Sequence, residues 1–453
     1  MIRLFIVVVF AFFLVSSFSY SQALYGHEMN QFRERVAIPI ESKQDIARLV
    51  KADIEIDRCS LEEKTVYAYA TPEEVKLIEY LGFQATLSPD IIGKNTRENS
   101  YHTYEALTAK LKQFAKDYPS IAKLESIGQS VEKRELWILK ISDNVEEDEA
   151  EPEVKYVSTM HGDEVVGQEM FVYLIQLLLE NYGKDAQLTA LVNDLEIWIM
   201  PNMNPDGTAK KRRYNSQWVD LNRNFPDVQS DINNDPTGRA VETQAMMKFS
   251  GSRNFCLSLN FHGGAVVMNY PWDTMAGDPP NVELVRFLCL GYSKRNIPMY
   301  KSTSFKDGIT NGYDWYEVNS GMQDWNYHWH NCLDLTVEVS QQKWPGADTL
   351  PQYWKDNKES LLWSLAQARR GIQGIVKDKV TQKAVEAKIQ VSNISKVFTT
   401  NKGNGFYNLV LMPGKHTVKF TAPGYEDYIL NVLVEDNDVK IYTVNVNMIP
   451  QIR

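Results

Sequence analysis

Cysteine is scarce in this sequence, which contains 4 among 453 residues: Cys59, Cys256, Cys289 and Cys332. None of them has the spacing of a zinc-binding cysteine motif, so the sequence does not indicate a cysteine-ligated metal site. If disulfides form, the 4 cysteines allow three connectivities, and their spacing favours none of these.

An excess of positive charge is also missing. The chain carries 58 acidic and 48 basic residues, which gives a net charge of -10. Surfaces that bind nucleic acid concentrate lysine and arginine. We therefore expect no nucleic-acid partner, and nothing in the composition indicates an oligomeric state.

The sequence has only one long apolar run. It extends over the 12 residues from Leu4 to Val15, after Arg3, and small and polar residues follow it up to Ser21. A bilayer requires roughly 20 apolar residues, whereas a run of this length is typical of a secretory signal. We predict a signal peptide over residues 1–21 and a secreted or periplasmic protein with no stable membrane span; a retained anchor is the alternative.

Residues 24–90 have the pattern of a small α+β domain. Strand-like runs at 35–40 and 65–70 surround a predicted helix. A second helix is predicted from the capping residue Thr71, followed by Pro72, to Gly82. This domain carries no catalytic grouping and is a candidate pro-segment or a folding aid. Residues 88–100, rich in Ser, Pro, Gly and Asn, predict a linker and a site of processing.

Residues 101–370 alternate between helical and strand patterns, which predicts an α/β fold with a mixed, mostly parallel sheet covered by helices. The predicted helices are 104–118, 165–179 and 357–370. The predicted strands are 124–128, 136–142, 154–159, 195–200, 255–260 and 333–339. Sites in such sheets lie at the carboxyl ends of strands. Residues 371–449 contain short alternating runs separated by turns such as Pro413-Gly414, which predicts a small all-β sandwich.

Metal-binding residue types follow two of the predicted strands. His161 and Glu164 come after the strand at 154–159, and His262 follows the strand at 255–260. Two His and one Glu form a catalytic zinc set that leaves one position for water. Since a zinc hydrolase also needs a base, Glu338 within a strongly apolar strand is the best candidate. The alternative for Glu338 is an outward-facing position on an edge strand. Asp220 is a candidate to orient a zinc-bound His.

These residues lie in stretches that resemble the zinc metallocarboxypeptidase family, in the regulatory subgroup of carboxypeptidases N, E, M and D. The matching stretches, within about 101–370, are His161–Glu169, Met203–Gly207, Asp220–Asp227, His262–Asp273, Gly308–Gly312, Gly321–Tyr327 and Asn331–Glu338. The predicted sandwich resembles the transthyretin-like domain that follows the catalytic domain in this subgroup. The resemblance implies a carboxypeptidase-like fold.

The resemblance also implies roles for individual residues. One Zn2+ is held by His161, Glu164 and His262, and Glu338 is the general acid/base. Arg213 stabilises the oxyanion, although the basic run Lys210–Arg213 leaves its register open by one residue. The remaining roles concern the substrate: its terminal carboxylate is bound by Asn222, Arg223 and Tyr327, and a C-terminal Arg or Lys side chain pairs with Asp273.

Two features depart from the subgroup. Most of its members have no N-terminal pro-segment, whereas residues 24–90 are a candidate for one. The segment after Tyr327 also differs, and we interpret His328 and His330 as surface or packing residues.

The sequence thus predicts an exported zinc carboxypeptidase that removes C-terminal residues from peptides or proteins, with a preference for Arg or Lys. One alternative is the same fold acting on peptidoglycan or modified peptides. Another alternative is a non-catalytic binding protein.

Overall fold

The computed structural model describes residues 33–88, 101–231, 233–435, 439 and 441–451. The predicted signal peptide lies outside these residues, as does most of the predicted linker. Backbone contacts join Arg33–Arg453 into one unit. Among the described residues, no helix is both long enough and apolar enough to cross a bilayer.

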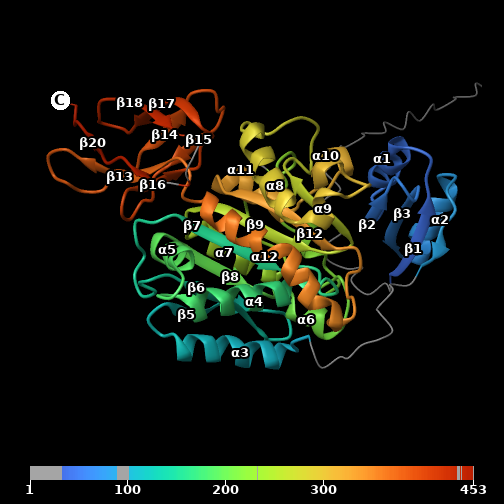
Figure 1. Ribbon diagram of the computed structural model, residues 1–453. Helices are drawn as coiled ribbons and strands as arrows, with labels where there is room; N and C mark the ends of the chain where they lie inside the picture. The colour runs from blue at the N-terminus through green and yellow to red at the C-terminus, as the bar shows by residue number, and fades with distance from the viewer. Residues whose placement is uncertain (1–32, 89–100, 232, 436–438, 440, 452–453) are drawn as a thin grey trace, which may run out of the picture. The chain divides into compact units, whose positions relative to one another are not determined.

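An eight-stranded mixed sheet lies at the centre of residues 101–370, with the strand order β11-β10-β12-β9-β7-β8-β6-β5 (Figure 1). Pairing is parallel for β11–β10, β12–β9, β9–β7 and β7–β8, and antiparallel at the other junctions. This confirms the predicted mixed, mostly parallel sheet. The strands are β5 (Ala122–Gln129), β6 (Glu135–Ile141), β7 (Glu153–Ser158), β8 (Glu196–Met200), β9 (Phe255–His262), β10 (Ala265–Tyr270), β11 (Ile309–Asn311) and β12 (Leu333–Ser340).

Helices cover both faces of this sheet. Successive residues of β8 point to opposite faces, so that Ile197 and Trp198 belong to different hydrophobic clusters. The first cluster includes apolar residues of α3 (Tyr104–Asp117), α4 (Val166–Asn181), α5 (Ala186–Asp194), α8 (Val282–Arg295) and α12 (Leu350–Gln367). The second includes apolar residues of α7 (Val241–Gly251) and α11 (Met322–His330). Shorter helices are α6 (Pro205–Ala209), α9 (Ile297–Tyr300) and α10 (Gly312–Trp315).

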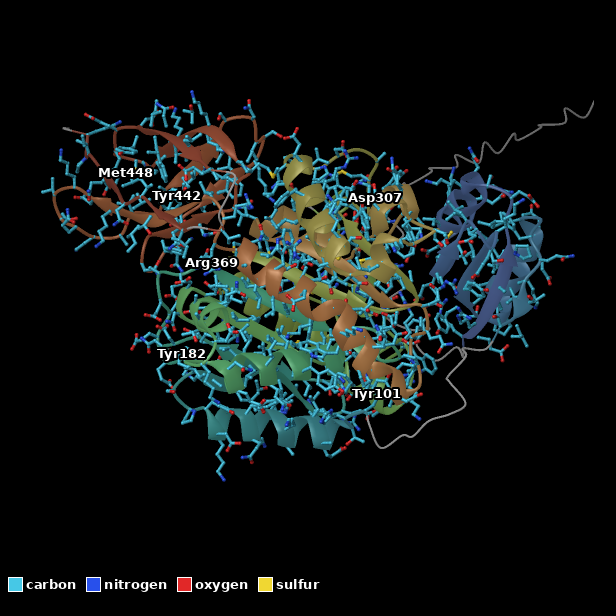
Figure 2. All side chains as sticks on the ribbon, in the orientation of Figure 1. Tyr101, Tyr182, Asp307, Arg369, Tyr442 and Met448 are labelled. Carbon is cyan, nitrogen blue, oxygen red and sulfur yellow. The ribbon has the colours of Figure 1, made fainter. Side chains whose placement is uncertain are left out.

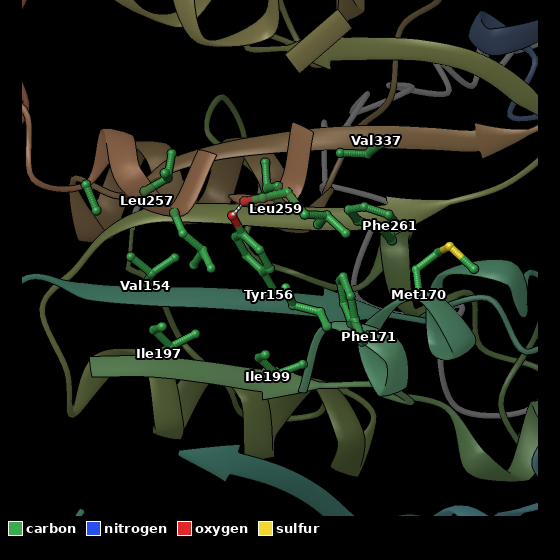
Figure 3. Close-up of a cluster of buried hydrophobic side chains, with 14 of the residues drawn as sticks. Val154, Tyr156, Met170, Phe171, Ile197, Ile199, Leu257, Leu259, Phe261 and Val337 are labelled. Carbon is green, nitrogen blue, oxygen red and sulfur yellow. Dashed lines mark hydrogen bonds between the residues drawn. The ribbon is translucent and has the colours of Figure 1, made fainter. Parts of the chain in front are cut away.

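Aromatic side chains fill the space between α4 and the sheet. Phe171 of α4 stacks on Tyr156 of β7 and also contacts Phe261 of β9 (Figure 3). The Tyr156 hydroxyl donates to the Leu361 carbonyl of α12 at 3.1 Å. Burial of a polar hydroxyl is tolerated because it has this acceptor. The layer holds the ends of β7 and β9 in place, where the candidate metal ligands lie.

The start of α12 differs from the prediction. The predicted helix begins at Asn357, whereas α12 begins at Leu350. Pro351 reads as a helix breaker in sequence, but proline is compatible with the first turn because the first N–H groups have no partner inside the helix. Beyond the other end of α12 lies Arg369, which is labelled in Figure 2. Its guanidinium pairs with the Asp194 carboxylate at 2.7 Å.

Residues 33–88, named the leader domain here, form an antiparallel sheet of order β2-β3-β1-β4 with two helices. The elements are β1 (Glu34–Pro39), α1 (Lys43–Lys51), β2 (Glu55–Ser60), β3 (Thr65–Ala70), α2 (Pro72–Tyr80) and β4 (Thr86–Leu87). The Thr71 side chain accepts a hydrogen bond from the Glu74 N–H, as a helix cap does. The domain has its own buried cluster, which includes Ile38 and Leu49.

Two small sheets around one buried cluster make up the region from residue 372 to 448. One contains β16-β13-β19, with β20 also paired to β13, and the other has the order β15-β14-β17-β18. The strands are β13 (Ile372–Asp378), β14 (Lys388–Val391), β15 (Val397–Thr399), β16 (Phe406–Leu409), β17 (Gly414–Thr421), β18 (Tyr428–Val434), β19 (Tyr442–Thr443) and β20 (Val446–Met448). All four cysteines of the chain are buried thiols.

Candidate metal centre

Three side chains with metal-binding atoms converge beyond the carboxyl ends of β7 and β9. His161 and Glu164 lie in the turn after β7, and His262 is the last residue of β9. Glu164 Oε2 is 3.0 Å from His161 Nδ1 and 3.0 Å from His262 Nδ1. The two Nδ1 atoms are 3.1 Å apart, and all three residues are buried.

This triangle fits a single zinc ion. Bonds of about 2.0–2.2 Å to zinc place neighbouring ligand atoms about 3.3 Å apart in a tetrahedron. The donor set of two imidazoles and one carboxylate is one that catalytic zinc uses. Burial alone would raise the pKa of Glu164, but His161 and Lys343 hold it well below its usual value. The carboxylate is therefore ionised, as a metal ligand must be.

The turn that carries His161 is held by a close backbone approach. A Cβ atom on Gly162 would lie 2.2 Å from the carbonyl carbon of Gly207, so only glycine fits there. The Asn204 side-chain amide donates to the carbonyls of Met160 and Arg213, at 3.1 and 3.2 Å. The motif Asn204–Gly207 thus braces the metal-binding turn.

Asp220 lies behind one of the imidazoles. Its Oδ1 is 3.1 Å from His161 Nε2. When His161 Nδ1 binds a metal, Nε2 carries the proton and donates it in this hydrogen bond, which fixes the ring orientation. Asp220 Oδ2 also accepts from Arg213 at 2.8 Å. This is the position that the sequence analysis expects for a residue orienting a zinc ligand.

Glu338 lies on β12 beside the metal-binding residues. It is in register with His262 on β9, and it lines the same pocket. Burial, together with the nearby Glu164 carboxylate, raises the pKa of Glu338 to about 8. Its Oε2 atom is buried and has no hydrogen-bond partner among the described residues. Such a carboxylate is suited to accepting a proton from water.

Arg213, and not Arg212, enters the pocket. Arg213 is 2% exposed and pairs with Asp220, whereas the Arg212 guanidinium lies over the Trp218 ring at 4.3 Å. Of the two adjacent arginines, Arg213 is thus the one whose side chain lines the pocket. Asn222 and Arg223 line the same pocket, where Asn222 Oδ1 accepts from the Met322 N–H at 3.1 Å.

Asp273 lies deep in the pocket without an ion-pair partner in the part of the chain that the structure describes. Its Oδ1 accepts from Asn269 Nδ2 at 2.9 Å and from Gln323 Nε2 at 3.0 Å. Burial raises the pKa of Asp273 to about 7. A Cβ on Gly312 would lie 1.7 Å from Asp273 Oδ1, so Gly312 leaves the space that this carboxyl group occupies.

The family follows from comparison with known sequences. A family model described as zinc carboxypeptidase matches residues 107–360. The chain belongs to this family. It is 40% identical to carboxypeptidase D of Anas platyrhynchos over 361 residues, which cover 74% of this chain and 26% of that protein. It thus spans about a quarter of the length of carboxypeptidase D.

Two relatives are covered over most of their own length. Carboxypeptidase M of Mus musculus is 37% identical, with 74% of this chain and 81% of that protein covered. The carboxypeptidase N catalytic chain of Homo sapiens is 36% identical, with 74% and 83% covered. These matches confirm the predicted subgroup.

Solved carboxypeptidase structures share the fold. The carboxypeptidase A of Helicoverpa armigera aligns with a TM-score of 0.60 at 17% identity, over 76% of this chain and 98% of that one. Thrombin activatable fibrinolysis inhibitor aligns with a TM-score of 0.54 at 17% identity, over 75% of this chain and 98% of that one.

One residue assigned through the zinc carboxypeptidase motifs does not reach the pocket. Tyr327 is 1% exposed, and its hydroxyl donates to Asn281 Oδ1. Its ring packs edge to face on Trp272 and lies under the Lys396 ammonium at 3.8 Å. The structure therefore places Tyr327 in the packing between α11 and the C-terminal sandwich, away from the expected substrate position.

A different tyrosine lines the pocket. Tyr316 follows α10 and packs edge to face on Trp315. Burial raises the pKa of its phenol, which therefore remains protonated and can donate a hydrogen bond. Its position shortly after the matching stretch Gly308–Gly312 was the available sequence signal. Gln323, beside Asp273, was also missed, although it lies inside a matching stretch.

The two histidines after Tyr327 pack against aromatic rings. His330 lies 4.5 Å from Trp325, and His328 lies 4.5 Å from Trp329, between ring centroids. Burial lowers the pKa of both imidazoles. Both positions agree with the interpretation of these residues as surface or packing groups.

Proposed function

We propose that this protein is an exported, zinc-dependent metallocarboxypeptidase that hydrolyses the C-terminal peptide bond of peptides or proteins and prefers C-terminal Arg or Lys. The observation that carries the proposal is the triangle of His161, Glu164 and His262 beside Glu338 in one pocket. The predicted signal peptide at 1–21 supports export.

Zinc, held by His161, Glu164 and His262, would supply Lewis acidity and lower the pKa of a water molecule. Glu338 takes the proton from the attacking water and later delivers it to the leaving amine. A general acid/base performs both steps best when its pKa lies near the working pH, and burial raises the pKa of Glu338 above its usual value. Arg213 supplies N–H donors to the negative charge that develops on the scissile carbonyl oxygen.

Polar groups of the same pocket recognise the C-terminal residue of the substrate. Asn222 and Arg223 bind the terminal carboxylate, since a guanidinium matches the geometry of a carboxylate. Tyr316 takes the donor role that the family resemblance had assigned to Tyr327. This assignment rests on the position of its phenol in the pocket lining.

Asp273 supports the preference for basic residues. Its burial costs free energy when it is ionised, and the Arg223 charge offsets only part of that cost, because Asp273 forms no ion pair among the described residues. A guanidinium or ammonium group of the substrate would supply the missing counter-charge. Gln323 holds the Asp273 carboxyl group in position through its side-chain amide.

The test compares peptide acids with the corresponding peptide amides. We expect zinc-loaded protein to remove a C-terminal Arg from a peptide acid, and chelation or Glu338→Gln to abolish this activity. Equal cleavage of acid and amide would contradict the exopeptidase proposal and favour the alternative of a modified-peptide or peptidoglycan substrate. A purified protein that binds zinc and peptides but cleaves none would favour a non-catalytic binding protein.

The domain boundaries belong to the same proposal. The catalytic domain spans 101–370, the transthyretin-like sandwich 371–449, and the N-terminal domain 24–90, a candidate pro-segment. Peptide or protein C-termini are the proposed partners.

A further inference from the structure

One sheet of the C-terminal sandwich, with the order β15-β14-β17-β18, turns an outer face to solvent. The strand register places Val397, Gln390, Lys419 and Ile429 in one row across these four strands. Residues that lie opposite one another in a sheet project from the same face. Val418, the neighbour of Lys419 along β17, is buried and points to the opposite face, into the core of the sandwich. The row therefore belongs to the outer face of the sheet.

Strand β18 forms the edge of this sheet, and its exposed side chains include two large aliphatic ones. It pairs only with β17. Ile429 is 61% exposed and Leu433 is 55% exposed, whereas Leu430 and Val432 pack against the buried cluster of the sandwich. The strand, Tyr428–Val434, contains no charged residue, proline or glycine, although such residues commonly protect a sheet edge. An unprotected aliphatic edge of this kind indicates a surface that a partner covers.

The same outer face is positively charged. Lys388 and Lys415 are exposed on it, and Lys419 is half-exposed and pairs with Asp427 at 2.7 Å, just before β18. Glu435 follows β18, and it accepts a hydrogen bond from the Tyr442 hydroxyl at 3.0 Å. Among the outward positions of these four strands, all of them described, there is no carboxylate. Since the whole chain carries a net charge of -10, this face is complementary to an anionic partner.

The combination of lysines with aliphatic residues favours an anionic lipid surface over a soluble polyanion. A polyanion would pair with the lysines and leave Ile429 and Leu433 in water. At a bilayer surface, aliphatic side chains enter the boundary between headgroups and acyl chains, and long lysine side chains reach back to the phosphates. Because no described helix is able to span a bilayer, such contact is peripheral for the described residues.

We propose that the outer face of the β15-β14-β17-β18 sheet binds the surface of membranes that contain anionic phospholipid. In this arrangement Lys388 and Lys415 lie against lipid phosphates, while Ile429 and Leu433 enter the interface. The proposal goes beyond the carboxypeptidase function and does not depend on it. Binding of this kind would hold the catalytic domain close to peptides and proteins at the membrane surface.

The experiment measures flotation of the chain without its signal peptide with two kinds of lipid vesicle. One kind contains phosphatidylcholine alone, and in the other phosphatidylglycerol replaces a third of it. We expect partition into the anionic vesicles to exceed partition into the neutral ones roughly tenfold, and to fall as salt is added. Absence of binding to the anionic vesicles would overturn the proposal, and so would equal binding to both kinds.

Two double variants test the residues of the face. We expect Lys388→Gln with Lys415→Gln to weaken partition about thirtyfold, since each lysine near an anionic surface contributes on its own. We expect Ile429→Ser with Leu433→Ser to weaken it roughly tenfold.

The controls change residues of the same kinds in the turn between β13 and β14 of the same sandwich. Val380→Ser removes an aliphatic side chain that is 77% exposed, and Lys379→Gln with Lys383→Gln removes two exposed lysines. Both controls should bind as the wild type does. Equal loss in the controls would show that the binding depends on overall charge or hydrophobicity, and would overturn the assignment to this face.

The two double variants also separate a membrane from another anionic partner. If the lysine variant loses binding while the serine variant binds as the wild type does, the face recognises charge alone, and the membrane proposal is wrong. Hydrogen exchange of the wild type needs no variant. The amides of β18 should exchange more slowly on anionic vesicles, and unchanged exchange in vesicle-bound protein would overturn the proposal. None of these measurements uses hydrolysis, so their failure leaves the proposed function untouched.

Discussion

At the scale of single residues, the pocket combines buried carboxyl groups whose pKa values are shifted in opposite directions by their neighbours. Glu164 and Asp220 remain ionised because cationic partners lie beside them, whereas burial raises the pKa of Glu338 and Asp273. Groups whose pKa values are pushed apart in this way can divide ligand and proton-transfer roles between them. Each of these side chains can be tested by a substitution that preserves its size.

Removing the hydroxyl group of Tyr316 and that of Tyr327 in turn tests which tyrosine binds the substrate. We expect Tyr316→Phe, in protein freed of the leader domain, to raise KM for a peptide ending in Arg about tenfold. A hydrogen bond to a charged group contributes about 1.5–3 kcal/mol. Tyr327→Phe should leave kcat and KM within twofold, because the Tyr327 hydroxyl bonds Asn281 outside the pocket. Steady-state kinetics of the two variants measures these changes in kcat and KM. A larger rise in KM for Tyr327→Phe than for Tyr316→Phe would restore the sequence-based assignment of Tyr327.

Asp273 is the specificity residue of the proposal. We expect Asp273→Asn to lower kcat/KM for C-terminal Arg at least a hundredfold, because a buried charge pair is lost, and to change turnover of a C-terminal Leu far less. The measurement is the ratio of the two kcat/KM values. A ratio that stays constant would exclude Asp273 as the partner of the basic side chain.

At the scale of elements, one ion pair ties the start of the catalytic domain to helix α4. His102 Nδ1 lies 2.7 Å from Glu169 Oε2, and the His102 N–H donates to Oε1 of the same carboxylate at 2.8 Å. The hydrogen bond to Glu169 raises the pKa of His102 above that of a free imidazole, although partial burial opposes it. The protonated imidazole therefore stabilises the junction between residue 102 and α4.

The pH dependence of this contribution has a definite sign. Because the pKa of His102 is raised in the folded state, the stabilisation is complete below about pH 6.5, the unfolded value. It is lost as the pH rises through the folded value. We expect His102→Gln to cost about 1 kcal/mol at pH 5.5, an amount reduced by partial exposure, and less at pH 8.5.

Urea unfolding at both pH values measures this difference. His416→Gln is the control, since His416 lies on β17 and bonds only the Met412 carbonyl among the described residues. A cost of His102→Gln that is equal at pH 5.5 and 8.5 would show that the ion pair does not contribute.

At the scale of the whole molecule, metal binding is coupled to stability because the ligands come from distant parts of the chain. His161 and His262 are brought together only when β7 and β9 pair side by side. A ligand that binds only the folded state stabilises it by about 4 kcal/mol at a thousandfold excess over Kd. We expect chelation to lower the unfolding temperature by several degrees and added zinc to restore it.

Calorimetry of two variants tests whether the zinc-dependent shift in unfolding temperature comes from the proposed site. Glu338→Gln should keep the zinc-dependent shift, since Glu338 is not a ligand, and His262→Gln should abolish it. A shift that survives in His262→Gln would place the metal elsewhere in the molecule.

Local sequence alone determined much of this architecture. Short strand-like apolar runs located β7, β8, β9 and β12, and a capping residue followed by proline located α2, because these signals act over a few residues. The boundaries of α12 and the strand β10 were missed. The start of α12 was missed because a proline in the sequence does not show whether it breaks a helix or lies in the first turn of one, as Pro351 does. Strand β10 was missed because its pairing with β12 defines it.

The grouping of His161, Glu164 and His262 could be predicted because they follow strands whose ends meet at one edge of the sheet, and Glu338 because it is a carboxylate inside an apolar strand. Tertiary structure alone decided which of two adjacent arginines enters the pocket, and that Tyr316 rather than Tyr327 faces it. It also decided that Asp57, from a separate sheet, reaches Arg213. Motif spacing describes neighbours along the chain, whereas these contacts depend on how separately folded elements pack.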